Sequence, residues 1–154
     1  MNKSMRYLYG HIICNEKTYV KYLQERNLLP ELGSCSKLKV GVICGGTLKE
    51  YQKNNRKRNS NGDLLKTTYL RCQKKGCQTY HSLRKKNPFF TYYDKNGKSN
   101  SGLALNEIVE LVWYWVYQIS VSMTEKFTTK TRNTIVDWNN LCRDVAVAMF
   151  DKRK

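Results

Sequence analysis

Hydrophobic and polar positions change their spacing twice along this chain of 154 residues. In the first part, apolar side chains recur at helical spacing and form one stripe. The stripe consists of Tyr19, Val20, Tyr22, Leu23 and Leu28. The spacing predicts a helix over 16–28, with Asn15 as its N-cap and Pro30 closing it.

The middle of the chain has short apolar pieces broken by glycine, which is typical of small strands and turns. Val40, Val42 and Ile43 favour strand, and further strands are predicted over 64–72 and 78–83. The intervening residues 51–63 are nearly all polar. They form either a hairpin excursion or a floppy loop, with Asn61 and Gly62 as a turn signal.

Beyond the polar segment 96–102 the pattern is helical to the end. Residues 105–116 are apolar on more than one face, which predicts a buried helix. A short piece follows over 121–127, and Thr128 is the predicted N-cap of a long helix. The predicted inner face of that helix comprises Ile135, Trp138, Leu141, Cys142, Val145 and Met149. No run approaches eighteen apolar residues, so no membrane-spanning helix is expected, and no secretory leader is apparent.

Six cysteines occur without a signal for secretion, which favours metal binding over a disulfide framework. Cys72 and Cys77 form a tight pair with Gly76 before the second thiol, and Cys44 is followed by two glycines. Such turns curl backbone amides toward a metal ion. Together with Cys35 these residues predict a four-thiolate site for structural Zn2+. The spacings C-x8-C and C-x4-C are wider than usual.

Alternatives to this zinc site remain open at the level of sequence. His81 can replace Cys35 as the fourth ligand, because neutral imidazole also binds zinc. Buried free thiols are the non-metal interpretation of the same residues. Cys142 lies on the apolar face of the last predicted helix and is expected in the core, whereas Cys14 and His11 fit no pattern.

The distribution of positive charge indicates the kind of partner that the chain binds. The chain has 28 Lys and Arg against 12 Asp and Glu, a formal net charge of +16. Residues 51–98 hold thirteen basic against two acidic residues, a net charge of +11. Because this charge is clustered, it predicts a phosphate-binding surface more than a merely solvated one. The expected phosphate contacts are Arg71, Lys74, Lys75, Arg84, Lys85 and Lys86.

The C-terminal third carries the second candidate contact. A short helix, a break and a longer helix form the outline of a helix-turn-helix, although an ordinary helical hairpin has the same outline. In a helix-turn-helix, the start of the second helix enters the major groove of DNA. Lys130, Arg132 and Asn133 are the residues expected to face bases there.

The sequence therefore predicts an α+β protein with three parts. They are an N-terminal helix with its lead-in over 1–30, a basic zinc-ribbon-like β unit over 31–98 and a helix-turn-helix-like helical domain over 99–154.

Five phrases in this order resemble the N-terminal DNA-binding region of Merlin-type DDE transposases, relatives of ISXO-like insertion-sequence transposases. They are Val20–Pro30 (VKYLQERNLLP), Cys44–Leu48 (CGGTL), Tyr69–Cys77 (YLRCQKKGC), Ser82–Phe90 (SLRKKNPFF) and Thr131–Arg143 (TRNTIVDWNNLCR). The resemblance covers roughly residues 16–145. The chain departs from the family at Gly41, where a cysteine is expected, and in the length of the basic loop 51–63.

The resemblance implies a zinc ribbon and a helix-turn-helix that bind double-stranded DNA at transposon ends. It also implies that the catalytic domain, which follows this region in the family, is absent, so no enzyme activity is expected. A separate transposase chain or self-association is the implied protein partner; no membrane and no small-molecule substrate are implied. An RNA-binding zinc-ribbon protein and an inactive transposase remnant are the alternatives. The basic runs 56–58 and 152–154 suggest nuclear localisation, or association with the nucleoid in a prokaryote.

Overall fold

The N-terminal helix begins at its predicted capping residue. The computed structural model describes residues 4–30, 33–58, 62–84, 87–91 and 103–153, and in it α2 spans Glu16–Glu25. Asn15 accepts a hydrogen bond from the Thr18 N–H, and the Thr18 side chain accepts one from the Asn15 N–H. The helix ends earlier than predicted, before Asn27 at φ 58°, so Leu28 lies beyond it and is exposed. Two short helices precede it, α1 (Met5–Tyr7) and the π-helix η1 (Leu8–Ile12).

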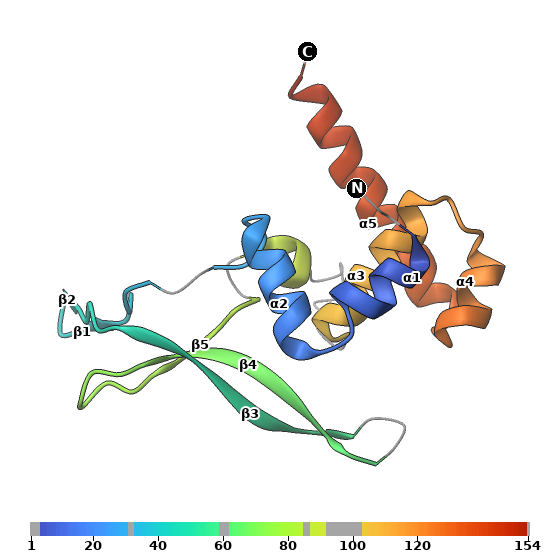
Figure 1. The fold of residues 1–154 in the computed structure, drawn as a ribbon. Helices are drawn as coiled ribbons and strands as arrows, with labels where there is room; N and C mark the ends of the chain where they lie inside the picture. Colours follow the sequence, from blue (N-terminus) through green and yellow to red (C-terminus); the bar gives the residue numbers. More distant parts are fainter. Residues whose placement is uncertain (1–3, 31–32, 59–61, 85–86, 92–102, 154) are drawn as a thin grey trace. The chain divides into compact units, whose positions relative to one another are not determined.

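Five strands form two antiparallel sheets (Figure 1). They are β1 (Leu38–Lys39), β2 (Val42–Ile43), β3 (Leu48–Arg58), β4 (Leu64–Cys72) and β5 (Tyr80–Ser82). β1 and β2 make a hairpin, and the other three pair in the order β3-β4-β5. The polar stretch is thus a hairpin arm rather than a loop, with β4 bounded as predicted and β5 shorter than predicted. Asn61 of its predicted turn lies outside the described residues.

Val40 corrects the strand prediction for the first hairpin. It lies in the two-residue turn with Gly41, at φ 52° and 77° respectively, and its side chain is 99% exposed. Positive φ at both central residues is the geometry that a two-residue hairpin of this twist requires. The turn therefore overrides the strand preference of a β-branched side chain.

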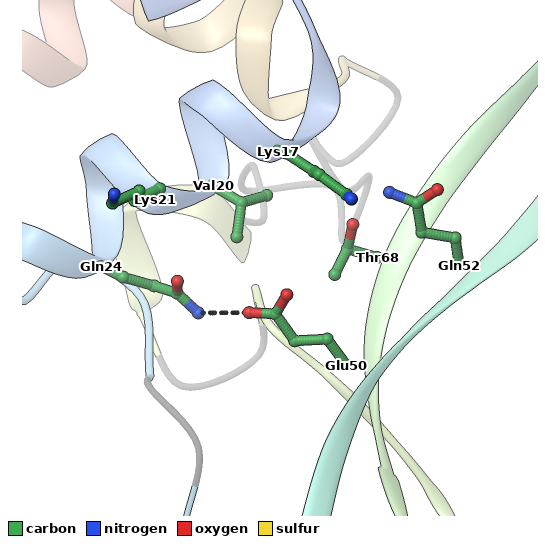
Figure 2. Close-up of a pocket in the computed structure, with 7 residues that line it drawn as sticks. All are labelled: Lys17, Val20, Lys21, Gln24, Glu50, Gln52 and Thr68. Carbon is green, nitrogen blue, oxygen red and sulfur yellow. Dashed lines mark hydrogen bonds between the residues drawn. The ribbon is translucent and has the colours of Figure 1, made fainter.

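Helix α2 packs on one face of the three-stranded sheet. The Thr68 N–H donates to the Glu16 carboxylate at 2.9 Å, and burial raises the pKa of Glu16. Gln24 Nε2 donates to Glu50 Oε1 at 3.4 Å across a cleft of about 500 Å³ (Figure 2). Lys17, Val20, Lys21, Gln24, Glu50, Gln52 and Thr68 line this cleft. Alternate residues of β3 and β4, among them Glu50, Gln52 and Thr68, therefore face α2.

The chain forms two compact units, Met1–Gly102 and Leu103–Lys154. The first contains the helices and sheets above together with the 3₁₀-helix η2 (Pro88–Thr91). The second contains α3 (Leu105–Val116), α4 (Val121–Thr128) and α5 (Arg132–Asp151). The architecture is α+β, as predicted. Across the described helices, none combines the length and the apolar character that crossing a membrane requires.

In the second unit, α3 and α4 each pack on α5. Ile108, Ile135 and Trp138 are at most 2% exposed and form its core. Cys142 is buried as predicted, but Val145 and Met149 are exposed, which corrects the predicted inner face. The reason is length, because α5 has 20 residues whereas α3 has 12 and α4 has 8.

The start of α5 also differs from the prediction. Thr128 is not its N-cap: it is the buried last residue of α4, and its hydroxyl donates to the Thr124 carbonyl. Thr131 caps α5 by accepting a hydrogen bond from the Thr134 N–H. Between the helices, Thr129 adopts φ 56°, the left-handed conformation that ends α4. The connection is therefore a three-residue turn, 129–131.

Candidate metal centre and nucleic-acid interface

Four cysteines from both ends of the β unit converge on one point. The sulfur atoms of Cys35, Cys44, Cys72 and Cys77 all lie within 4.8 Å of one another. Cys44 Sγ is 3.7 Å from Cys72 Sγ, and Cys35 Sγ is 3.9 Å from Cys77 Sγ. A disulfide needs about 2.05 Å, whereas sulfurs around a tetrahedral zinc ion, each about 2.3 Å from it, lie about 3.8 Å apart. The four residues are thus placed to hold one metal ion, as predicted.

The wide spacing between Cys35 and Cys44 is explained by the β1–β2 hairpin. The Cys44 N–H donates to the Lys37 carbonyl at 2.9 Å, and the Gly45 N–H donates to the Cys35 carbonyl at 2.9 Å. The two cysteines therefore stand at the base of the hairpin, side by side although eight residues separate them. The hairpin thus brings the two cysteines of this C-x8-C pair together, as a tight turn brings together those of a C-x2-C pair.

The second pair closes through a turn at the end of β4. The Cys77 N–H donates to the Lys74 carbonyl at 3.1 Å, and Gly76 adopts φ 89°. The Cys72 N–H donates to the Thr79 carbonyl at 3.0 Å. This turn aims both thiols at the first pair, as expected for a chain that must curl around a metal ion.

Gly46 is required by the close approach of the two turns. A Cβ at this position would lie 2.6 Å from Cys72 Sγ and 2.8 Å from Lys74 Cβ. It would also lie 3.4 Å from Cys44 Sγ. Only a residue without a side chain leaves the four sulfurs room to meet.

Lysine side chains link the two turns. Lys37 Nζ donates to Thr79 Oγ1 at 3.1 Å, and Lys39 Nζ donates to the Gly76 carbonyl at 3.1 Å. In the opposite direction, Lys74 Nζ donates to the Cys44 carbonyl at 3.2 Å. Four thiolates around a divalent ion carry a net charge of −2, so these ammonium groups also offset the charge of the loaded site.

His81 contacts the cluster without belonging to the four-sulfur group. Its Nε2 lies 3.2 Å from Cys35 Sγ, while Cys35 itself has its sulfur among the other three. The imidazole is therefore placed to hydrogen-bond the Cys35 sulfur, the position of an outer partner that orients a ligand. Of the two candidates for the fourth position, the geometry brings Cys35 into the group.

The thiols differ in acidity. Hydrogen bonds from Thr79 lower the pKa of Cys77 to about 6, and Thr79 Oγ1 lies 3.4 Å from its sulfur. Burial raises the pKa of Cys72 to about 11 and also raises that of Cys35. Both of these residues have 0% exposure. Cys77 is thus the thiolate available first to an incoming ion, and Cys35 and Cys72 must release protons to it.

The predicted phosphate contacts differ in their exposure and in the residues that they contact. Lys74 and Lys75 lie exposed in the turn between Cys72 and Cys77. Arg71 lies on β4 beside Tyr51 and Tyr80. Arg84 is half-buried, and its Nη2 donates to the Phe90 carbonyl at 2.8 Å. Lys85 and Lys86 lie outside the described residues.

The three predicted base contacts differ in their exposure. Lys130 is ion-paired with Glu107 of α3 and is half-buried, so it ties the turn before α5 to α3. Arg132 and Asn133 are exposed in the first turn of α5. Of the three predicted base contacts, Arg132 and Asn133 are therefore the two that remain open to a partner.

Sequence reasoning missed several residues at the centre. Lys37, Lys39 and Thr79 act through contacts between segments about forty residues apart, which no local pattern reveals. Gly46 was part of the predicted turn after Cys44, but its close approach to Cys72 and Lys74 was not predicted.

Comparison with known proteins returns no match: no family model, no curated protein and no solved structure is significantly similar to the chain.

The packing around Gly46 yields a direct test. Gly46→Ala should lower the affinity for Zn2+ at least tenfold, because the added Cβ would overlap Cys72 Sγ and Lys74 Cβ. Competition against a chromophoric chelator measures this affinity. Gly10→Ala is the matched control, since a Cβ there meets nothing within 4 Å. Equal affinities for the two variants would contradict the arrangement described.

The acidity of the thiols predicts a strong pH dependence. Cys35 and Cys72 keep their protons in the metal-free protein at neutral pH, because burial raises both pKa values. Metal binding releases at least these two protons, so affinity should fall at least about a hundredfold for each pH unit of acidification near neutrality. The same competition assay in two buffers one pH unit apart tests this. An affinity that does not change with pH would show that these thiols are not ligands.

Proposed function

We propose that this protein is a zinc-stabilised DNA-binding protein derived from the front end of a Merlin-type transposase. It contacts duplex DNA through its basic zinc-ribbon unit and its helix-turn-helix, and it does not itself cleave DNA. The observation that carries the proposal is the concentration of positive charge on the same unit that holds the four cysteines.

Zinc is the metal that this donor set favours. Four thiolates are soft ligands that select zinc or iron over magnesium or calcium. The spacing of the sulfurs, 3.7 and 3.9 Å for the two measured pairs, suits a tetrahedral ion. With four protein ligands the ion has no open position, so its role is structural. Its binding supplies folding free energy on the order of 10 kcal/mol to a unit with few buried apolar residues.

The distribution of charge supports a nucleic acid as partner. Residues 1–102 hold 21 Lys and Arg against six Asp and Glu, a net charge of +15, whereas residues 103–154 have a net charge of +1. When such a surface binds the phosphates of a nucleic acid, counterions of the nucleic acid are released. This release gives affinity without sequence preference. Lys74 and Lys75, exposed beside the metal site, are the first phosphate contacts we assign.

The helical unit supplies the sequence-reading part of the proposal. Helices α4 and α5 are joined by the three residues 129–131, the connection typical of a helix-turn-helix. Arg132 and Asn133 project from the first turn of the second helix. Their side chains can each make two hydrogen bonds to a base edge, Arg to guanine and Asn to adenine.

The biological setting follows from the same proposal. Such a protein acts in the nucleus, or at the nucleoid in a prokaryote, either with a separate transposase chain or as a self-associating protein.

Salt and one substitution test duplex binding. The affinity for a duplex oligonucleotide should fall steeply with salt, with a log–log slope of about −0.9 for each phosphate contacted. Arg132→Gln should weaken binding to a preferred sequence about fivefold or more, because it removes a contact to a base edge. Fluorescence anisotropy on labelled duplexes measures both.

Arg143→Gln provides the control for this test, because Arg143 is exposed on the same helix but far from its first turn. It removes the same charge and should leave sequence preference unchanged. Duplex binding that hardly responds to salt would refute the proposal.

A further inference from the structure

The sheet face opposite α2 gathers aromatic and basic side chains. Successive residues of a strand point to opposite faces of the sheet. The face that α2 covers carries the buried residues Leu48, Thr68 and Leu70. The opposite face carries the set that we call the tyrosine face: Lys49, Tyr51, Lys53, Tyr69, Arg71 and Tyr80. The strand register places Tyr51 beside Tyr69, and Arg71 between Lys49 and Tyr80.

The rings of this face hold one another in place. Tyr51 and Tyr69 both meet Tyr80 edge to face, with centroids 5.6 and 6.1 Å apart. Lys53 Nζ lies 4.2 Å from the Tyr80 centroid. The Arg71 guanidinium carbon lies 5.6 Å from the Tyr51 centroid and 5.4 Å from that of Tyr80. Cations and rings therefore alternate in a packed array that is ordered before any partner arrives.

The face is also open and positively charged. Tyr51 is 44% exposed, and Lys49 and Lys53 are exposed beside it. None of the ion pairs found among the described residues involves a cation of the tyrosine face. Its six residues include no acid, and Glu50 lies on the other face, next to Gln24. The charge is thus free to pair with an outside anion.

We infer that the tyrosine face binds an unpaired strand of nucleic acid. A partner matching this surface needs both negative charges and flat π faces, which phosphates and bases supply together. Bases within a duplex are stacked on each other and offer no free face, so the exposed Tyr51 ring selects unpaired nucleotides. Lys49, Lys53 and Arg71 hold the phosphates while one base stacks on Tyr51. This inference rests on the sheet alone and not on duplex binding by the helical unit.

Two labelled single strands, oligo-dT and oligo-U of equal length, test the inference by fluorescence anisotropy with the zinc-loaded full chain. Tyr51→Leu should weaken single-strand binding about fivefold or more, since base–aromatic stacking is lost. Tyr51→Phe keeps the ring and should bind as the unaltered chain does. Preference for oligo-dT or for oligo-U tells whether the natural strand is DNA or RNA.

Matched controls isolate the effect. Tyr117→Leu alters a tyrosine of equal exposure (45%) on the other unit. Lys53→Gln should weaken single-strand binding because it removes a phosphate contact, and Lys21→Gln, which removes a charge from α2 on the covered side of the sheet, is its control. Each control should keep the affinity of the unaltered chain, and equal metal content should confirm that the variants fold.

Photo-crosslinking gives a readout that needs no variant. A single strand carrying 5-bromouracil should cross-link to Tyr51 in the unaltered chain, as mapped by mass spectrometry. The inference is overturned if the unaltered chain binds neither single strand, if Tyr51→Leu binds like Tyr117→Leu, or if cross-links map away from the tyrosine face. A chain that binds single strands but no duplex upholds this inference and contradicts the proposed duplex binding.

Discussion

The structure of the basic unit depends on four sulfur atoms that meet at one point. Thiolates at separations of 3.7 and 3.9 Å repel one another unless a cation lies between them. The β1–β2 hairpin beside them has strands of only two residues each, and it buries none of these four residues. Apolar burial therefore cannot hold this hairpin against the larger sheet. Four sulfurs placed to hold a metal ion, together with lysines that reach from one turn to the other, link the hairpin to the larger sheet.

This link also explains how so basic a unit stays folded. Repulsion among 21 basic side chains opposes compaction and acts against the apolar core to which Leu8, Leu23 and Leu70 belong. The negative charge of four thiolates would favour the ammonium groups of Lys37, Lys39 and Lys74, which form hydrogen bonds between the two turns at the exposed rim of the site. Other cations, such as Lys49, Lys53 and Lys75, are exposed on the surface, where the proposed partner neutralises them. The proposed metal binding and the proposed nucleic-acid binding thus depend on the same charge distribution.

Features that depend on local sequence patterns could be predicted from the sequence, whereas features that depend on contacts between distant residues could not. The bounds of β4 and α3 follow from unbroken local patterns and were predicted well. The start of α5 was placed three residues early, because Thr128 and Thr131 are equally good caps and only the packing of α4 chooses between them. All four cysteines were identified. The tyrosine face was not, because Tyr51, Tyr69 and Tyr80 meet only through the register of three strands.

Substitution of the bound metal by cobalt tests the central claim most directly. A tetrahedral site of four thiolates gives Co2+ intense visible absorption and strong sulfur-to-metal charge-transfer bands, at one ion per chain. The account predicts this spectrum, its loss in Cys72→Ser, and its bleaching when zinc is added back. A chain that takes up no cobalt, or shows the weak spectrum of an oxygen-coordinated ion, yet retains its β structure, would contradict the account.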